Sequence, residues 1–207
     1  MTKIILDKNI IVPNYLDKSD TSKVIYAIGM NNKPTVVSDS ELDTMQGTEM
    51  FRTVTGLSKP PITSKEILEQ IRTSDYTRLS QNNSSAYGRA LYFANDFEES
   101  VSYGKTWTSA IMRVKLNPNA KILSEVELLK KMGEDESYKS KFFHTMQADS
   151  YALYAISHGI DGWYDKKKGY YMIVNRGAIT ASSTSKKTIN ENFFGFSYES
   201  WTEAADA

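Results

Sequence analysis

The stretch Gly88-Arg89-Ala90-Leu91-Tyr92-Phe93-Ala94 carries more structural information than any other part of this 207-residue chain. A glycine turn leads into a short strand that contains two adjacent aromatic residues. The residues that follow predict a turn of helix, which sets Ser100 and Tyr103 on one helix face because they are three residues apart. An aromatic surface beside a hydroxyl and an accessible backbone suits a flat ligand that carries an amide group, such as nicotinamide.

The composition is that of an ordinary globular protein without net charge. Apolar residues make up 40% of the chain and charged residues 24%, and 25 basic residues balance 25 acidic ones. No global field therefore favours nucleic acid or an anionic membrane as a partner. The one tight basic run inside the expected fold is Lys166-Lys167-Lys168, which we interpret as a solvated hairpin turn, with a local basic patch as the alternative.

The chain has no cysteine and two histidines, His144 and His158. Disulfide bonds, thiol nucleophiles and cysteine-ligated metals are therefore excluded, and a multi-histidine metal site is not expected. Residues 1–12 alternate polar and apolar side chains and lack the apolar run of a signal peptide or a membrane span. We expect a protein that acts in the cytoplasm, with no membrane partner and no metal.

Short strands interrupted by helices predict an α+β fold. Apolar patterns and turn residues predict strands over 49–54, 90–94, 109–116, 160–164, 170–174 and 179–181, and helices over 38–46, 64–72, 96–103, 125–132 and 139–158. Strands do not alternate regularly with crossover helices, which argues against a doubly wound parallel sheet. No linker is visible, so we expect one domain over 1–207, with flexible polar residues over 182–192.

Two further segments complete a pattern with the glycine-aromatic stretch. Met50-Phe51-Arg52-Thr53 lies upstream of it, and Tyr170-Tyr171-Met172-Ile173-Val174-Asn175 lies downstream. In this order and at these separations, the three segments resemble the NAD-binding core of the ADP-ribosyltransferase superfamily. Residues 33–181 are similar to domains associated with phage minor head proteins and bacterial toxins. The stretch from Gly88 to Tyr103 also resembles poly(ADP-ribose) polymerases, with Arg52 where those enzymes carry a histidine.

This resemblance implies a mixed or antiparallel split-sheet core with flanking helices over 33–181 and a C-terminal extension over 182–207. It implies NAD as a consumed substrate, without a metal. Arg52 would orient the pyrophosphate or adenosine side of NAD, and Ser100 would hydrogen-bond the carboxamide. Tyr92 and Tyr103 would enclose the nicotinamide ring, with a stacking contribution of ~1–3 kcal/mol. The implied NAD-binding residues are Arg52, Thr53, Gly88, Tyr92, Phe93, Ala94, Ser100 and Tyr103, and the implied catalytic residues are Arg52, Tyr92 and Tyr170.

One position departs from the family pattern. Many members have a glutamate at the start of the last core strand, where its carboxylate stabilises the positive charge that develops as the glycosidic bond breaks. Tyr170 occupies that position here, and an ordinary phenol is neutral near pH 7. A carboxylate from elsewhere is one explanation, from Asp161, Asp165, Glu98 or Glu99, although we interpret the two aspartates first as turn residues. The others are a slow or substrate-assisted transferase, in which Tyr170 orients the ribose, and NAD binding without turnover.

The function implied by the resemblance is mono-ADP-ribosyl transfer by a phage or bacterial effector. The acceptor would be a host macromolecule, either protein or RNA, in the host cytoplasm, or the protein would be associated with the virion. The loop over 73–87 would cover the donor or meet the acceptor. Two alternatives stay open: a module that binds NAD or ADP-ribose without cleaving it, and a phage structural or interaction protein that uses the fold as a scaffold.

Overall fold

The computed structural model describes residues 3–7, 10–13, 34–55, 90–102, 108–136, 147–192 and 195–203. The chain groups into two compact units made of interleaved segments. Unit 1 comprises residues 1–33, 72–92 and 120–176, and unit 2 comprises residues 34–71, 93–119 and 177–207. The glycine-aromatic stretch is divided between the two units: residues up to Tyr92 belong to unit 1, and residues from Phe93 onward belong to unit 2.

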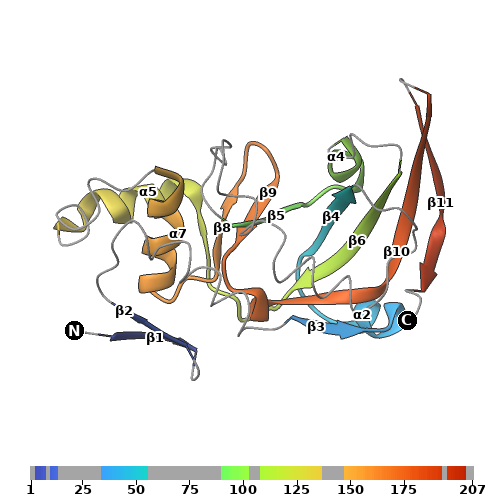
Figure 1. The fold of residues 1–207 in the computed structure, drawn as a ribbon. Coiled ribbons are helices and arrows are strands. Elements are labelled where there is room, and N and C mark those ends of the chain that lie inside the picture. Colours follow the sequence, from blue (N-terminus) through green and yellow to red (C-terminus); the bar gives the residue numbers. More distant parts are fainter. Residues whose placement is uncertain are drawn as a thin grey trace. The chain divides into compact units, whose positions relative to one another are not determined.

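Unit 2 is a mixed sheet with two short helices. Its antiparallel strands follow the order β11-β10-β6-β4-β5, and β3 (Thr35–Val37) runs parallel to β10. The strands are β4 (Glu49–Thr55), β5 (Leu91–Ala94), β6 (Thr108–Leu116), β10 (Ile179–Asn192) and β11 (Gly195–Glu203), and the helices are α2 (Asp39–Thr44) and α4 (Phe97–Ser102). A 3₁₀ turn over Arg176–Ala178 leads into β10 (Figure 1).

Helix α2 begins where the sequence predicts. Ser38 is its N-cap, and the Ser38 side chain accepts a hydrogen bond from the backbone N–H of Glu41. The Glu41 carboxylate in turn accepts from the backbone N–H of Ser38, which completes a capping box. Leu42 on the same helix is fully buried. The cap fixes where α2 begins, and Leu42 is the residue that the helix buries in the core of unit 2.

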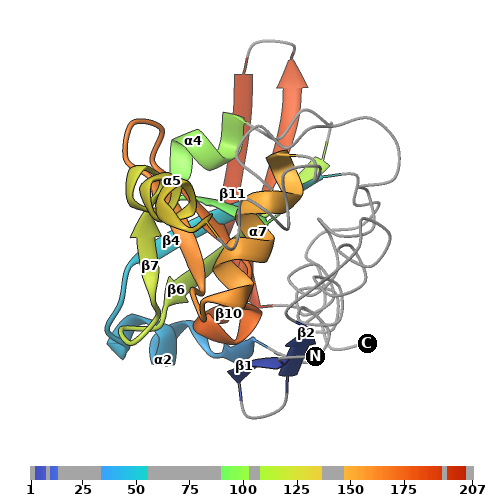
Figure 2. The same ribbon diagram turned by 90° about the vertical axis from the view of Figure 1, so that its left-hand side faces the viewer.

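Unit 1 combines a two-stranded hairpin, three further paired strands and two helices. The strands β7 (Ile122–Ser124) and β8 (Gly162–Asp165) are parallel, and β8 pairs with β9 (Tyr170–Ile173) in an antiparallel hairpin. Strands β1 (Lys3–Asp7) and β2 (Ile10–Pro13) form a separate antiparallel pair. Figures 1 and 2 both show helices α5 (Glu125–Glu134) and α7 (Gln147–Ser157) beside each other.

The core of unit 1 joins these helices to the β8–β9 hairpin. Trp163 on β8 is completely buried and meets Tyr151 of α7 edge to face, with 6.0 Å between the ring centroids. Met172 of β9 and Leu128 of α5 belong to the same cluster of buried residues. Gly162 precedes Trp163 at a point where a Cβ atom would collide with the Met172 carbonyl, so only glycine fits there.

Gly159 ends helix α7, as the sequence predicts. It has φ +62°, a left-handed conformation that favours glycine. The Gly159 N–H donates to the Ile156 carbonyl, and the Ile160 N–H donates to the Ala155 carbonyl. These two bonds form a Schellman motif, which satisfies carbonyls at the helix end and turns the chain towards β8.

The α+β class is confirmed, and most predicted elements are present with boundaries shifted by one to three residues. The C-terminal part differs, because the expectation of flexible residues over 182–192 is wrong. Strand β10 continues to Asn192 and pairs with both β6 and β11. This polar segment lacks an apolar alternation, and long-range backbone pairing makes it a strand.

Other expectations stay predictions. The helix over 64–72 and the loop over 73–87 lie outside the described residues, as does the first part of the helix expected over 139–158. A single domain over 1–207 and the ADP-ribosyltransferase-like arrangement of the sheet are not tested by the described units.

Candidate functional site

Strand β4 and helix α4 are joined by a direct contact between two predicted site residues. The Thr53 hydroxyl donates a hydrogen bond to the main-chain carbonyl of Ser100 and lies 3.0 Å from the Ser100 hydroxyl. Ser100 is 2% exposed, and Thr53 is half-buried. Arg52 precedes Thr53 on β4 and is also half-buried, opposite Met112 of β6. Residues 47 positions apart in the chain therefore meet at one corner of unit 2.

The end of β5 completes this corner. Ala94 pairs with Phe51 of β4, and both Phe93 and Ala94 are buried. The Phe51 ring meets Phe97 of α4 edge to face at 5.6 Å between centroids. Three contacting elements of unit 2, β4, β5 and α4, therefore carry five of the predicted NAD-binding residues: Arg52, Thr53, Phe93, Ala94 and Ser100.

Tyr92 and Tyr170 both lie in unit 1. Both side chains are half-buried, and both pack against the cluster of buried residues formed by α5, α7, β8 and β9. The two remaining predicted residues, Gly88 and Tyr103, lie outside the described residues. The enclosure of a ring between Tyr92 and Tyr103 therefore stays a prediction.

Asp161, one of the alternative carboxylates, already accepts hydrogen bonds from its own fold through both carboxylate oxygens. Its Oδ1 accepts a hydrogen bond of 2.6 Å from the Asn175 side chain, and its Oδ2 accepts one of 2.7 Å from the Lys121 backbone N–H. Its main-chain carbonyl also accepts from the N–H groups of Val174 and Asn175. Both carboxylate oxygens hold the chain between β7, β8 and β9, which supports the interpretation of Asp161 as a structural turn residue.

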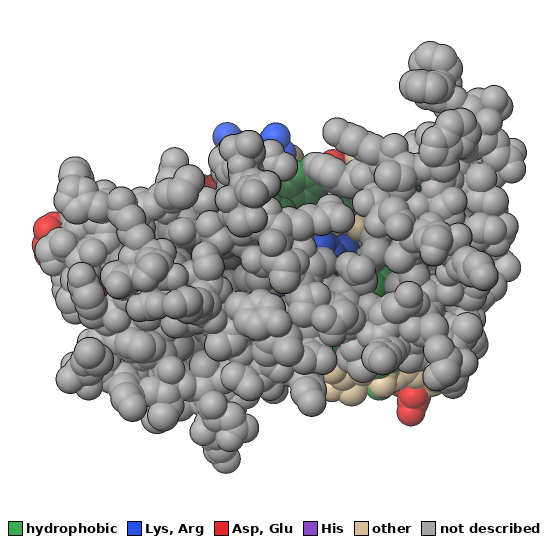
Figure 3. Space-filling view, in the orientation of Figure 1, with side chains coloured by type: hydrophobic (Ala, Val, Ile, Leu, Met, Phe, Trp, Pro, Cys, Tyr) green, Lys and Arg blue, Asp and Glu red, His purple; other side chains and the backbone are tan. Residues whose placement is uncertain are grey.

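Asp165, the second alternative, also orders a turn. It is 7% exposed, and its Oδ1 accepts from the backbone N–H groups of Lys167 and Lys168 at 2.9 and 3.3 Å. The three lysines from Lys166 to Lys168 are exposed on this turn, and Figure 3 shows basic side chains projecting at the upper edge of the molecule. Asp165 is also the register partner of Tyr170 across the hairpin.

Glu125 lies near these residues and was missed by sequence reasoning. It is the first residue of α5, directly after β7. Burial raises the pKa of its carboxyl group, the negative charge of Asp165 raises it further, and Lys167 partly opposes both effects. The sequence alone indicates that Glu125 is an ordinary acidic residue in the first turn of a helix. The pairing of β7 with β8 is what shows that Asp165 is its neighbour.

Glu98 and Glu99, the remaining alternatives, lie on α4 in unit 2. Glu98 is exposed and Glu99 is half-buried, and the backbone N–H of Glu99 donates to Asp96 Oδ1 at 2.9 Å. They follow Asp96 in the first turn of the helix, where negative charge is favoured by the helix dipole. Both glutamates can therefore be explained as acidic residues that stabilise the start of α4.

Ser157, His158 and Asp135 are arranged like a hydrolase triad, but the geometry opposes that chemistry. The Ser157 hydroxyl lies 3.1 Å from His158 Nδ1, and His158 Nε2 lies 3.3 Å from Asp135 Oδ2. The same Nδ1 is 2.9 Å from the main-chain carbonyl of Tyr154, which can only accept a hydrogen bond. The Ser157 hydroxyl donates a hydrogen bond to the same carbonyl at 3.1 Å, so its proton is directed at the backbone and not at His158. The cluster joins the ends of α5 and α7.

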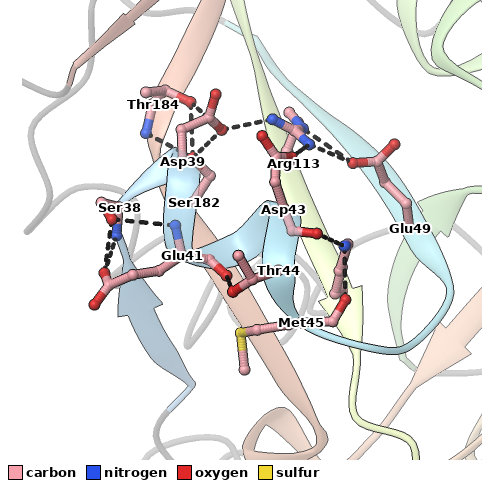
Figure 4. Close-up of polar contacts among 11 residues, drawn as sticks. Ser38, Asp39, Glu41, Asp43, Thr44, Met45, Glu49, Arg113, Ser182 and Thr184 are labelled. Atoms are coloured by element: carbon pink, nitrogen blue, oxygen red, sulfur yellow. Dashed lines mark hydrogen bonds and ion pairs between the residues drawn. The ribbon is translucent and has the colours of Figure 1, made fainter.

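A second charged cluster, in unit 2, is built around Arg113 of β6 (Figure 4). Its guanidinium binds Asp39 and Asp43 of α2, each at 2.6 Å, and Glu49 of β4 at 2.7 Å. Burial alone would lower the Arg113 pKa, but hydrogen bonds to Asp43 and Glu49 and the surrounding negative charges raise it. Every named carboxylate faces the guanidinium, so the cluster fastens α2 to the sheet.

Asp39 extends this cluster to β10. Its Oδ1 accepts hydrogen bonds from the hydroxyls of Ser182 and Thr184 at 2.8 and 3.0 Å. Both hydroxyl residues are buried. The extension beyond residue 181 is therefore tied to α2 by side chains as well as by strand pairing.

The described residues contain no group of three or more histidine, cysteine, aspartate or glutamate side chains that could hold a metal ion. In the same part of the chain, no helix is both long and apolar enough to cross a membrane.

Comparison with protein-family models, with curated proteins and with solved structures finds no match for this chain.

Proposed function

We propose that this protein is an NAD-dependent mono-ADP-ribosyltransferase. The single observation that carries the proposal is the hydrogen-bonded pair Thr53 and Ser100, which brings Arg52 and the strand-helix corner of the glycine-aromatic stretch together. Pairing of Phe51 with Ala94 supports the same grouping. Parts of two of the segments that resemble the superfamily, around Arg52 and from Phe93 to Ser100, are thus neighbours within unit 2, although they are distant in sequence.

In the proposed reaction, the bond between C1′ of the nicotinamide ribose and the ring nitrogen breaks, and its electron pair leaves with nicotinamide. An oxygen or nitrogen of the acceptor forms the new bond to C1′ and loses its proton. Arg52 would orient the pyrophosphate or adenosine side, because a guanidinium binds phosphate through a fixed fork of donors. Ser100 would position the carboxamide, and Tyr92 and Tyr170 would face the ring and the ribose.

The biological setting in this proposal is a phage or bacterial effector that modifies a host protein or RNA in the host cytoplasm. NAD is consumed as the substrate, and no metal takes part. The absence of net charge favours neither class of acceptor.

The test is incubation of the full chain with NAD labelled in nicotinamide or in adenosine. Release of labelled nicotinamide, or transfer of the adenosine label to a macromolecule, supports the proposal. Arg52→Ala and Ser100→Ala are expected to lose turnover, whereas Ser102→Ala, an exposed serine on the same helix, serves as the matched control. Wild-type turnover in both site variants would contradict the assignment.

A second candidate is a module that binds NAD or ADP-ribose without cleaving it. Two observations favour it: Tyr170 stands where a catalytic carboxylate is expected, and both oxygens of Asp161 are engaged by the fold. Saturable NAD binding without nicotinamide release over hours would select this candidate.

A further inference from the structure

Helix α5 carries apolar side chains on its outer surface as well as in the core of unit 1. Leu128 is completely buried in that core, and Met132, four residues further on, packs against it. Val126 and Leu129, three residues apart, are 76% and 41% exposed instead. Among the described residues, these are the two most exposed large apolar side chains. Because they lie one helical turn apart, they form a stripe on the surface of the helix.

Gly133 continues this stripe, four residues beyond Leu129. A glycine inside a helix destabilises it relative to alanine, so its presence needs a reason. The backbone of Gly133 does not have a positive φ, and a Cβ atom added there would have nothing within 4 Å. Neither the conformation nor the packing of this chain requires glycine at this position, whereas the close approach of a second backbone would.

The stripe is complementary to itself. Val126 and Gly133 lie at equal distances from the middle of the helix, which falls next to Leu129. If two identical helices pack antiparallel about that point, Val126 of each copy fits beside Gly133 of the other, and the two Leu129 side chains meet near the twofold axis. Such a contact buries the same surface on both copies and closes on itself.

The charges beside the stripe favour the antiparallel direction. Two hydrogen bonds from Ser124, first from its side chain and then from its backbone, lower the pKa of Glu127, which therefore stays charged. Lys130 is exposed and makes a long contact in its own helix, 4.0 Å from its Nζ to Glu134 Oε1. Antiparallel packing sets Glu127 of each copy near Lys130 of the other, whereas parallel packing sets like charges side by side. The helix dipoles favour the same direction.

We propose that the outer surface of α5, formed by Val126, Leu129, Lys130 and Gly133, binds a second copy of this chain through a twofold-symmetric, antiparallel contact between the two α5 helices. The ten residues of α5 span about 15 Å, so the contact is smaller than the ~1,200–2,000 Å² of a standard stable interface. The dimer is therefore weak, with a Kd in the micromolar range or above. It does not depend on the NAD chemistry proposed above.

The absence of cysteine from the chain permits a direct test by disulfide cross-linking. Leu129→Cys places two thiols near the twofold axis, where the Cα separation of about 4.4–6.8 Å that a disulfide needs is within reach. Lys131→Cys, an exposed position on the same helix outside the stripe, is the matched control. Under mild oxidation, we expect Leu129→Cys to form a covalent dimer about 10-fold faster than Lys131→Cys or more. Equal rates for the two variants would overturn the proposal.

Two further cysteine variants test the direction of the helices. In the antiparallel arrangement, Val126→Cys and Gly133→Cys are each about 10 Å along the helix axis from the same position in the second copy. Each variant alone should therefore cross-link slowly, and a mixture of the two should form mixed dimers rapidly. Cross-linking that is as fast within one variant as in the mixture would contradict the antiparallel contact.

Sedimentation equilibrium of the full chain without added cysteine measures the association itself, from about 1 µM to about 1 mM protein. We expect the wild type to pass from monomer to dimer over this range. Val126→Glu should raise the dimer Kd about 10-fold or more, because a charge would lose water in the apolar contact. Circular dichroism checks that the variant is folded. A wild type that stays monomeric, or an unchanged Kd in a folded Val126→Glu variant, would show that α5 is not the contact.

Discussion

Thr53 on β4 and Ser100 on α4 are joined by a hydrogen bond from the Thr53 hydroxyl to the Ser100 carbonyl, with their hydroxyls 3.0 Å apart. Thr53→Val keeps the shape of the side chain and removes the donor. We expect a loss of about 1–2 kcal/mol in the free energy of unfolding, because the buried Ser100 carbonyl loses a partner. NAD affinity should fall as well, since Ser100 is expected to bind the carboxamide. Urea unfolding and calorimetric titration measure the two effects, with Ser102→Ala as the control.

Asp161 should matter for stability and leave the chemistry intact. Asp161→Ala removes the acceptors for the Asn175 side chain and the Lys121 backbone N–H, and we expect a loss of about 2–4 kcal/mol in the free energy of unfolding. Nicotinamide release per folded molecule should stay near the wild-type rate at a temperature where the variant is folded. A specific loss of turnover in a fully folded variant would show that Asp161 takes part in catalysis.

Arg113 should be essential for the attachment of α2. Arg113→Gln leaves Asp39, Asp43 and Glu49 without the charge that they share, and we expect a destabilisation of about 2–4 kcal/mol. Arg113→Lys keeps the charge and loses the planar fork, so its effect should lie between wild type and Arg113→Gln. Thermal unfolding of the three proteins checks the order, and equal midpoints for all three would contradict it.

The pH dependence of stability should report the contact between Asp43 and Arg113. The hydrogen bond from Arg113, and then its charge, lower the pKa of Asp43 below the ordinary value of 3.8. This stabilisation is therefore present above pH 3.8 and is lost as the pH falls through the folded-state pKa. Urea midpoints of wild type and Asp43→Asn should differ at about pH 6 and converge towards about pH 2. A difference that persists at the acidic end would exclude this origin.

Local signals in the sequence were sufficient for several elements. The serine cap with its glutamate three residues on predicts the start of α2 at Ser38, and Gly159 predicts the end of α7. Apolar patterns likewise predict β4, β5, β6 and the β8–β9 hairpin. These features depend on contacts between residues close in the chain, which a single sequence displays directly.

Strand β10 beyond Ala181 could not be predicted in this way. Its residues are polar, and no alternation distinguishes them from a loop. They form a strand because β6 and β11 pair with their backbone on either side, and because Asp39 binds the hydroxyls of Ser182 and Thr184. Both partners are distant in sequence, so no short window of residues contains the cause.

The candidate site shows the same difference between local features, which the sequence displays, and long-range contacts, which it does not. By itself, the sequence determined which residue types are available: a glycine-aromatic strand, Arg52, Ser100, and a tyrosine where a glutamate was expected. The tertiary structure alone decided that Thr53 binds Ser100, that Asp161 is engaged by the fold, and that Glu125 lies beside Asp165. The physical reason is that the partners in these contacts are distant in the sequence. The alternation of side chains along a strand shows which face is buried, but the residues of one strand or helix do not identify the distant element that packs or pairs with it.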